Sequence, residues 1–191
     1  MTDEELVKGC VANNPIVQKR LYEKYARKMF GVCLRYTNDK DEAEDVLQNG
    51  FIKVFAKLDT FKNTGSLEGW IRKIIVNTAL NHYRESKASM FDADIDEVAY
   101  MIPGVNNVSD TVNEKELLKL IQSLPPGFRA VFNLFAIEGY SHKEIAKELN
   151  ITEGTSKSQF ARARAALQKA LAKNDNELKD KKFIPNGEDT E

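Results

Sequence analysis

The chain has 191 residues, of which 42% are hydrophobic and 30% are charged, as in a globular protein of one or two domains. Its formal net charge of −1 excludes a protein that holds nucleic acid by bulk positive charge alone. No stretch approaches the ~18 consecutive apolar residues of a membrane span, and the N-terminus lacks the apolar segment of a signal peptide. We therefore expect a cytoplasmic protein with no membrane insertion of its own.

Charge is distributed unevenly along the chain. Residues 62–90 carry five basic and two acidic side chains, and residues 142–173 carry seven basic and three acidic ones. The segments 91–141 and 174–191 are acidic, with eight and six acidic residues against three basic ones in each. Two separate basic blocks allow the chain to contact a polyanion at two places while the acidic segments stay in solvent.

Hydrophobic residues recur at helical spacing, and no strand pattern is found. Three amphipathic helices are predicted in the first part of the chain, over residues 14–36, 41–58 and 67–87. Gly50 lies inside the second helix at a cost of about 1 kcal/mol relative to Ala, which close packing against another helix would explain. Ser66 is suited to cap the third helix.

The segment that follows the third helix is acidic and irregular, with "IPG" and "NN" inside it, and is expected to be a flexible linker. Helical spacing resumes at 112–123 and at 127–138, with Pro126 suited to the first turn of the latter helix. The polar C-terminal tail is predicted to be disordered. The expected architecture is all-α, with two small helical domains separated by the linker and followed by the tail: 1–88, 89–111, 112–173 and 174–191.

The clearest local signal is the run "YSHKEIAKELNITEGTSKSQFARARAAL". Ser141 and Glu144 form the Ser-x-x-Glu pattern of a capping box, which begins a short helix. Asn150 tolerates a left-handed turn, and Thr152 is suited to cap a second helix predicted over 153–171. A short helix, a tight turn and a long helix are the pattern of a helix-turn-helix, whose second helix enters the major groove of DNA.

The second helix of this unit has two distinct stripes. Phe160, Ala163 and Leu167 share the side expected to pack inward. The exposed stripe is polar and small: Thr155, Ser158, Gln159 and Arg162. Residues 154–173 contain five basic side chains and no acidic one, whereas a merely solvated basic helix usually carries acidic partners at i, i+4. The pattern therefore favours a face that contacts DNA.

A further polar stripe lies on the predicted helix 67–87. Its basic and amide side chains are spaced at i, i+4, i+8 and i+11: Lys73, Asn77, Asn81 and Arg84. Such groups suit single-stranded or melting DNA, where cations meet phosphates and an aromatic ring such as Trp70 stacks on an unpaired base. The alternative for Trp70 is a place in the core.

The predicted helix 41–58 also has a polar outer face, formed by Asp41, Asp45, Gln48, Asn49 and Ile52. Acidic residues are favoured in the first turns of any helix by its macrodipole, and no nucleophile accompanies these. An exposed Ile52 beside Gln48 indicates a surface that contacts another protein. A docking surface is therefore preferred to a catalytic site.

No catalytic residue, cofactor or metal site is predicted. The chain lacks a Gly-rich phosphate loop, a catalytic triad and metal-spaced His or Asp residues. Cys10 and Cys33 stand apart from any CxxC or Cys/His cluster and are expected to be free thiols. The chain is therefore not expected to be an enzyme.

Three segments share their order and spacing with one known family. They are "DEAEDVLQNGFIKVFAKL", "FKNTGSLEGWIRKIIVNTALNHYRES" and "IQSLPPGFRAVFNLFAIEGYSHKEIAKELNITEGTSKSQFARARAAL". They resemble, in turn, region 2.2, regions 2.3 and 2.4, and region 4 of bacterial RNA polymerase sigma factors, specifically the extracytoplasmic-function (ECF, group 4) type of the sigma-70 family. The resemblance covers residues 5–88 and 112–172. It implies a non-enzymatic subunit that directs core RNA polymerase to promoters by reading −35 and −10 elements and aiding promoter melting.

The resemblance also implies roles for individual positions. Docking on the β′ clamp helices of the polymerase falls to Asp45, Gln48 and Asn49. Contact with the −10 element falls to the stripe and the aromatic residue of the third helix: Trp70, Lys73, Asn77, Asn81 and Arg84. Reading of the −35 element falls to the recognition helix: Thr155, Lys157, Ser158, Gln159, Ala161 and Arg162.

Three positions depart from the family pattern. Asn49 stands where an acidic residue is more usual, Gln159 where Arg is common, and Ala161 where a bulkier side chain is common. The last two are expected to change which −35 sequence is preferred. The resemblance further implies that loop 59–66 captures a flipped base and that the linker threads towards the RNA exit path. The implied partners are core RNA polymerase (β′ clamp helices and β flap), promoter DNA and an anti-sigma factor.

The residues alone also fit a stand-alone helix-turn-helix transcriptional regulator, with 1–88 as a sensing or dimerisation domain. Adding core polymerase and a promoter template distinguishes the two functions. A sigma factor makes transcription start at defined sites, whereas an autonomous regulator binds duplex DNA tightly without polymerase.

Overall fold

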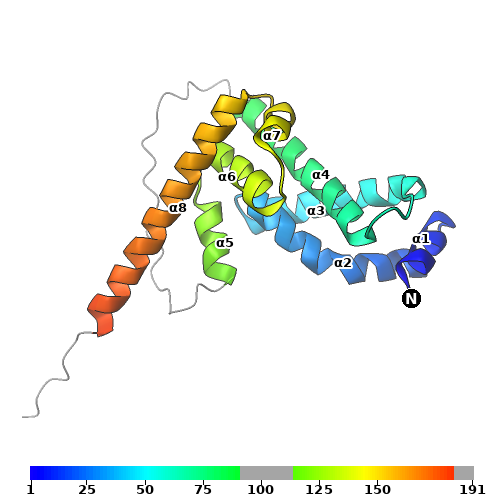
Figure 1. Ribbon diagram of the computed structural model, residues 1–191. Coiled ribbons are helices and arrows are strands. Elements are labelled where there is room, and N and C mark those ends of the chain that lie inside the picture. Colours follow the sequence, from blue (N-terminus) through cyan, green and yellow to red (C-terminus); the bar gives the residue numbers. More distant parts are fainter. Residues whose placement is uncertain (91–113, 183–191) are drawn as a thin grey trace, which may run out of the picture. The chain divides into compact units, whose positions relative to one another are not determined.

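The computed structural model of the protein describes residues 1–90 and 114–182 (Figure 1). All regular elements in these residues are helical, and the chain divides into two compact units, Met1–Asp96 and Glu97–Glu191. The predicted all-α architecture is therefore confirmed. Most of the predicted linker, from residue 91 onwards, lies outside the described residues.

The first helix, α1 (Asp3–Val11), lies in a segment for which the hydrophobic pattern predicts no element. The Thr2 hydroxyl accepts a hydrogen bond from the backbone N–H of Glu5 at 3.2 Å, and the Glu5 carboxylate accepts one from the N–H of Thr2 at 2.8 Å. The buried Tyr25 of α2 (Pro15–Tyr36) donates its hydroxyl proton to Asp3 at 2.8 Å. A helix of nine residues is marginal in water on its own, so packing against α2 stabilises it.

The core of the first unit is formed by α2, α3 (Lys40–Lys57) and α4 (Leu67–Met90), which contact one another pairwise (Figure 1). Helical spacing predicts one apolar stripe on each of the first two helices, and these stripes are buried apart from Phe55 of α3, which is half-buried. On α2 these residues are Leu21, Tyr25, Met29, Val32 and Tyr36, and on α3 they are Val46, Leu47, Phe51 and Val54.

Gly50 is buried in α3 and lies next to Ile75 of α4. A Cβ atom at this position would collide with Cδ1 of Ile75, a side chain that is itself fully buried. The glycine's cost in helix propensity, about 1 kcal/mol, is therefore explained by close helix packing, as predicted. Helical spacing predicts an apolar face on α4 that includes Ile71, Ile74 and Ile75. The buried face is wider than this, because Val76, Ala79 and Leu80 are buried as well.

A short 3₁₀ helix, η1 (Leu58–Thr60), ends α3 and leads into the loop before α4. Ser66 caps α4 as predicted, since its hydroxyl accepts a hydrogen bond from the N–H of Gly69 at 3.0 Å. The ring of Phe61 lies 5.5 Å from that of Trp70, centroid to centroid. This pair connects the loop to the first turn of α4.

Within residues 114–182, the second unit comprises five helical elements: α5 (Glu114–Gln122), α6 (Pro126–Phe132), the π-helical η2 (Asn133–Ile137), α7 (His142–Leu149) and α8 (Glu153–Lys182). Pro126 occupies the first position of α6, as predicted. The core forms where α5 and α6 meet α8, and Leu120, Leu124, Ala163 and Leu167 are buried there. The inward side predicted for the recognition helix is therefore confirmed for Ala163 and Leu167.

The turn between α7 and α8 has the geometry that its residues predict. The Ser141 hydroxyl accepts from the N–H of Glu144 and completes the capping box. Asn150 ends α7 in the left-handed conformation, with φ 52° and ψ 50°. The Thr152 hydroxyl accepts from the N–H of Thr155 at 3.0 Å and so caps α8. The predicted helix-turn-helix is thus confirmed.

The length of α8 differs from the prediction. The helix continues to Lys182 rather than ending near Leu171, so the prediction of disorder from residue 174 is wrong for 174–182. No glycine or proline occurs from Thr155 to Ile184, and nothing in the backbone chemistry stops the helix before Pro185. Residues 183–191 lie outside the described residues.

His142 connects α7 to α8 and η2. Its Nδ1 atom lies 2.9 Å from the hydroxyl oxygen of Ser156, whose side chain is fully buried in α8. Its ring stacks on Phe135 at a centroid distance of 4.3 Å and meets the edge of Phe160 at 5.9 Å. The contacts of His142 with Ser156 and Phe160 hold the recognition helix α8 against α7, the first helix of the motif.

We expect His142→Phe to lower the free energy of unfolding of the second unit by about 1–3 kcal/mol, because the ring still stacks but Ser156 is left buried without its partner. Thermal or urea unfolding of the full chain, followed by circular dichroism, measures the loss. The double variant with Ser156→Ala should recover part of it, since no buried hydroxyl is then orphaned. If the stability losses of the single variants His142→Phe and Ser156→Ala simply add in the double variant, the two side chains are not coupled and this account is contradicted.

Candidate nucleic-acid and protein interfaces

The recognition helix α8 presents all six predicted −35-reading positions to solvent. Lys157, Ser158, Ala161 and Arg162 are exposed, and Thr155 and Gln159 are half-buried. On the opposite side, Ser156, Ala163 and Leu167 are buried in the unit. The six residues are referred to below as the α8 face.

Several side chains of the α8 face are already bonded within the helix. The Thr155 hydroxyl lies 2.8 Å from that of Thr152, and the Ser158 hydroxyl donates to the carbonyl of Thr155 at 3.0 Å. Lys157 pairs with Glu153 at 2.7 Å. Gln159 and Arg162 have no hydrogen-bond or ion-pair partner among the described residues. These two side chains are therefore the most available for contacts with base edges.

The polar stripe of α4 is exposed along its whole length: Lys73, Asn77, Asn81 and Arg84. Arg84 donates a hydrogen bond from Nη1 to Oδ1 of Asn81 at 2.6 Å, which orders the C-terminal end of the stripe. Trp70 is half-buried against Phe61, so it takes part in packing while one part of its ring reaches the surface. These five residues are referred to below as the α4 stripe.

The outer face of α3 is likewise exposed at Asp45, Gln48 and Asn49. Ile52, one turn after Gln48, has 66% of its surface exposed, which is high for a large apolar side chain. These four residues, an acidic and two amide groups beside an apolar one, are referred to below as the α3 face.

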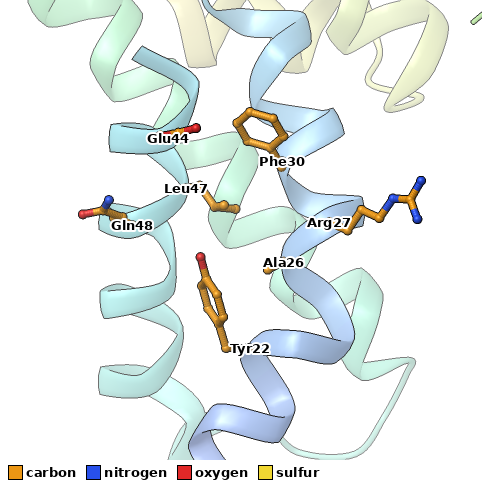
Figure 2. Close-up of a pocket in the computed structure, with 7 residues that line it drawn as sticks. All are labelled: Tyr22, Ala26, Arg27, Phe30, Glu44, Leu47 and Gln48. Carbon is orange, nitrogen blue, oxygen red and sulfur yellow. The ribbon is translucent and has the colours of Figure 1, made fainter. Parts of the chain in front are cut away.

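Beside the α3 face lies a hollow of about 300 Å³ between α2 and α3, shown in Figure 2. It is lined by Tyr22, Ala26, Arg27, Phe30, Glu44, Leu47 and Gln48. The Tyr22 side chain points between the two helices, and its ring meets the edge of Phe51 at 4.8 Å. Tyr22, Ala26 and Phe30 are not among the site residues that the sequence predicts, although their i, i+4, i+8 spacing forms a second apolar stripe on α2.

Within residues 1–90 and 114–182, no group of three or more His, Cys, Asp or Glu side chains is placed to hold a metal ion. No helix in the described part of the chain is long and apolar enough to cross a membrane. Cys10 and Cys33 are free and buried, and burial raises the pKa of Cys33 to about 12.

Comparison with known proteins agrees with the two-unit architecture. Residues 21–89 match the model of Sigma-70 region 2, and residues 114–167 match that of Sigma-70 region 4. The RNA polymerase sigma-H factor of Pseudomonas aeruginosa is 31% identical over 180 residues, covering 88% of this chain and 93% of that protein. The ECF RNA polymerase sigma-E factor of Escherichia coli K12 is 28% identical over 178 residues, covering 87% and 93%.

A solved structure has the same fold at lower identity. The sigma factor RpoE of Bartonella quintana, crystallised with the anti-sigma factor NepR, aligns with a TM-score of 0.50 and 24% identity, covering 81% of this chain and 96% of that one. The chain therefore belongs to the sigma-70 family of RNA polymerase sigma factors. It is a sigma factor of the ECF type, a non-enzymatic subunit that joins core RNA polymerase and directs the initiation of transcription at promoters. This decides against a stand-alone regulator.

Proposed function

We propose that the second unit reads the −35 element through the α8 face. The supporting observation is a complete helix-turn-helix, with α7 and α8 capped at the turn and the α8 face directed away from the core. The second helix of such a motif enters the major groove with its N-terminal residues at base edges. Gln159 and Arg162 carry most of the base recognition, because their polar groups have no other partner among the described residues.

The first unit recognises and opens the −10 element through the α4 stripe. Lys73 and Arg84 supply positive charge for phosphates, and Asn77 and Asn81 supply hydrogen bonds to base edges or sugars. The loop before α4, with Phe61 against Trp70, captures a base flipped from the non-template strand. Opening needs no catalytic group, because contacts with the extruded base offset the lost stacking.

Core RNA polymerase docks on the α3 face. Asp45 provides a negative charge for a basic partner surface, and Gln48 and Asn49 provide amide hydrogen bonds. The exposed Ile52 and the hollow beside Tyr22 give this surface apolar area to bury, which a purely polar face would lack. The β′ clamp helices are the polymerase element that this surface contacts, and the β flap contacts the second unit.

The function is tested by reconstituted transcription. The full chain is added to core polymerase with a library of promoter templates, and start sites are mapped. We expect initiation at a defined set of sites that share −35 and −10 sequences. Initiation at random sites, or none above core polymerase alone, would contradict promoter reading by this chain.

For the α4 stripe, we expect Lys73→Ala to slow promoter opening about tenfold while the fold is retained, because an exposed phosphate contact is lost. Permanganate footprinting of unpaired thymines measures the open complex formed with holoenzyme. Lys57→Ala, at the C-terminal end of α3, is the matched control, since it removes the same exposed charge outside the stripe. If the defect of Lys73→Ala lies in promoter opening, a template that is already unpaired around the −10 element should restore its activity.

Two further features belong to this proposal. The chain acts in the cytoplasm, where core polymerase is found. An anti-sigma factor holds it inactive. In support, the similar sigma factor RpoE was solved in complex with the anti-sigma factor NepR, and another similar chain, CnrH, was solved in complex with the cytosolic domain of CnrY. The test is whether a candidate anti-sigma protein co-expressed with the chain blocks its binding to core polymerase.

A further inference from the structure

Lys157 differs from the rest of the α8 face because its ammonium group is paired with a carboxylate. Its Nζ lies 2.7 Å from Oε1 of Glu153, one helical turn earlier, and the two side chains are 60% and 49% exposed. From Glu153 to Asn174, Glu153 is the only acidic residue in a stretch with five basic ones. A single negative charge thus lies beside the surface that is proposed to approach DNA.

We propose that Glu153 is an acidic brake on the α8 face: its carboxylate competes with DNA phosphates for the Lys157 ammonium and so weakens binding of the free chain to duplex DNA. This inference rests on the proposed role of the α8 face in reading the −35 element. It adds a residue that opposes binding to the residues that supply it.

The geometry allows competition rather than a permanent lock. An exposed i, i+4 pair contributes little to stability, so a phosphate can displace the carboxylate. The displaced carboxylate remains in the first turn of α8, the end that approaches base edges. DNA binding is therefore opposed twice, because Lys157 has to be released and a negative charge stays near the phosphates.

The surroundings of the Glu153 carboxylate favour its ionised form. The hydrogen bond from Lys157 lowers the pKa of Glu153, and the positive charge of Lys157 and the nearby His142 and Lys143 act in the same direction. A helix start favours an acidic residue in its first turn, which by itself accounts for a Glu at this position. It does not require the Glu to hold the one lysine of the α8 face.

The brake also fits the charge of the whole chain. Most non-specific affinity for DNA comes from the neutralisation of phosphates by basic side chains. A chain of net charge −1 has little excess positive charge for this purpose. Withholding Lys157 lowers that affinity further. Productive binding then depends on the polymerase, which brings the second unit to its site.

The test measures binding of the full chain, without polymerase, to a fluorescent duplex of random sequence by anisotropy over a salt series. We expect Glu153→Gln to bind about three- to tenfold more tightly at low salt, with the gain shrinking as salt rises. The slope of log K against log salt should steepen by about 0.9, the value for one more neutralised phosphate. Circular dichroism confirms that the helical content is kept.

Glu23→Gln is the matched control. Glu23 forms an exposed i, i+4 pair with Lys19 on α2, at 3.8 Å, and its substitution changes the net charge by the same amount. We expect it to leave DNA affinity unchanged. An equal gain from Glu23→Gln would assign the effect to net charge and overturn the brake.

Lys157→Gln separates this inference from the proposed function. If Lys157→Gln weakens binding and Glu153→Gln does not strengthen it, the brake is wrong while the α8 face stands. If neither substitution changes binding, the brake is wrong and the assignment of Lys157 to the α8 face fails with it. The brake is supported if most of the gain from Glu153→Gln disappears when Lys157 is also replaced by Gln.

Discussion

An Asp45→Arg substitution is expected to weaken binding of this sigma factor to core RNA polymerase by about a hundredfold, roughly 3 kcal/mol. Asp45 is exposed in the second turn of α3, on the same face as Gln48 and the largely exposed Ile52. Reversing its charge places like charges in contact across the interface, which costs several kcal/mol where a basic partner surface is buried. Equilibrium titration of labelled chain with core polymerase measures the change.

The fold should survive this substitution, because the predicted and observed core of the first unit lies on the other side of α3. A melting temperature within a few degrees of wild type checks this. Glu4→Arg, on the exposed surface of α1, applies the same change of charge elsewhere in the unit and should leave affinity for core unchanged. Full affinity in the Asp45→Arg variant would remove α3 from the docking proposal.

Arg162→Ala is expected to cost about 1–3 kcal/mol at the −35 element, which is roughly five- to 150-fold in affinity. The Arg162 side chain is exposed on α8 and has no partner among the described residues. A guanidinium group in this position can donate two hydrogen bonds to O6 and N7 of a guanine, the commonest specific contact in the major groove. Holoenzyme binding to a mapped promoter, compared with the same promoter carrying a scrambled −35 element, measures the loss.

Arg164→Ala is the control for this experiment. Arg164 is exposed on the same helix two residues later and lies outside the α8 face, so its loss removes the same charge. We expect it to weaken both templates slightly and equally. If Arg162→Ala also weakens both templates equally, Arg162 contacts phosphate only, and base reading at this position falls to Gln159 or another residue.

The local features of the helix-turn-helix could be predicted closely from the sequence. The capping box of Ser141 and Glu144, the left-handed Asn150 and the Thr152 cap all form as expected. Each depends on hydrogen bonds between residues no more than four apart, or on the backbone preference of one residue. Such interactions are encoded wherever the residue types occur in the right order.

Features that depend on distant residues could not be predicted in this way. The hydrophobic pattern gives no sign of α1, although Thr2 and Glu5 form a capping box that the order of residue types encodes. Contacts with α2 that stabilise this short helix, such as the hydrogen bond from Tyr25 to Asp3, join residues 22 positions apart. The hollow beside Tyr22 exists only because α3 packs against α2. The end of α8 differs from the prediction for another reason: the polar composition after residue 174 predicts disorder, but no helix breaker occurs before Pro185.

Helical period and capping residues thus establish, from the chain alone, where most helices begin and which polar side chains share a face. They do so because a helix repeats every 3.6 residues, so spacing along the chain is spacing around the axis. Tertiary packing determines which residues of a helix face remain exposed for contacts with a partner. It half-buries Trp70 against Phe61 and leaves Ile52 exposed. Side-chain partners depend on where neighbouring groups lie in space, and only the folded chain brings these groups together.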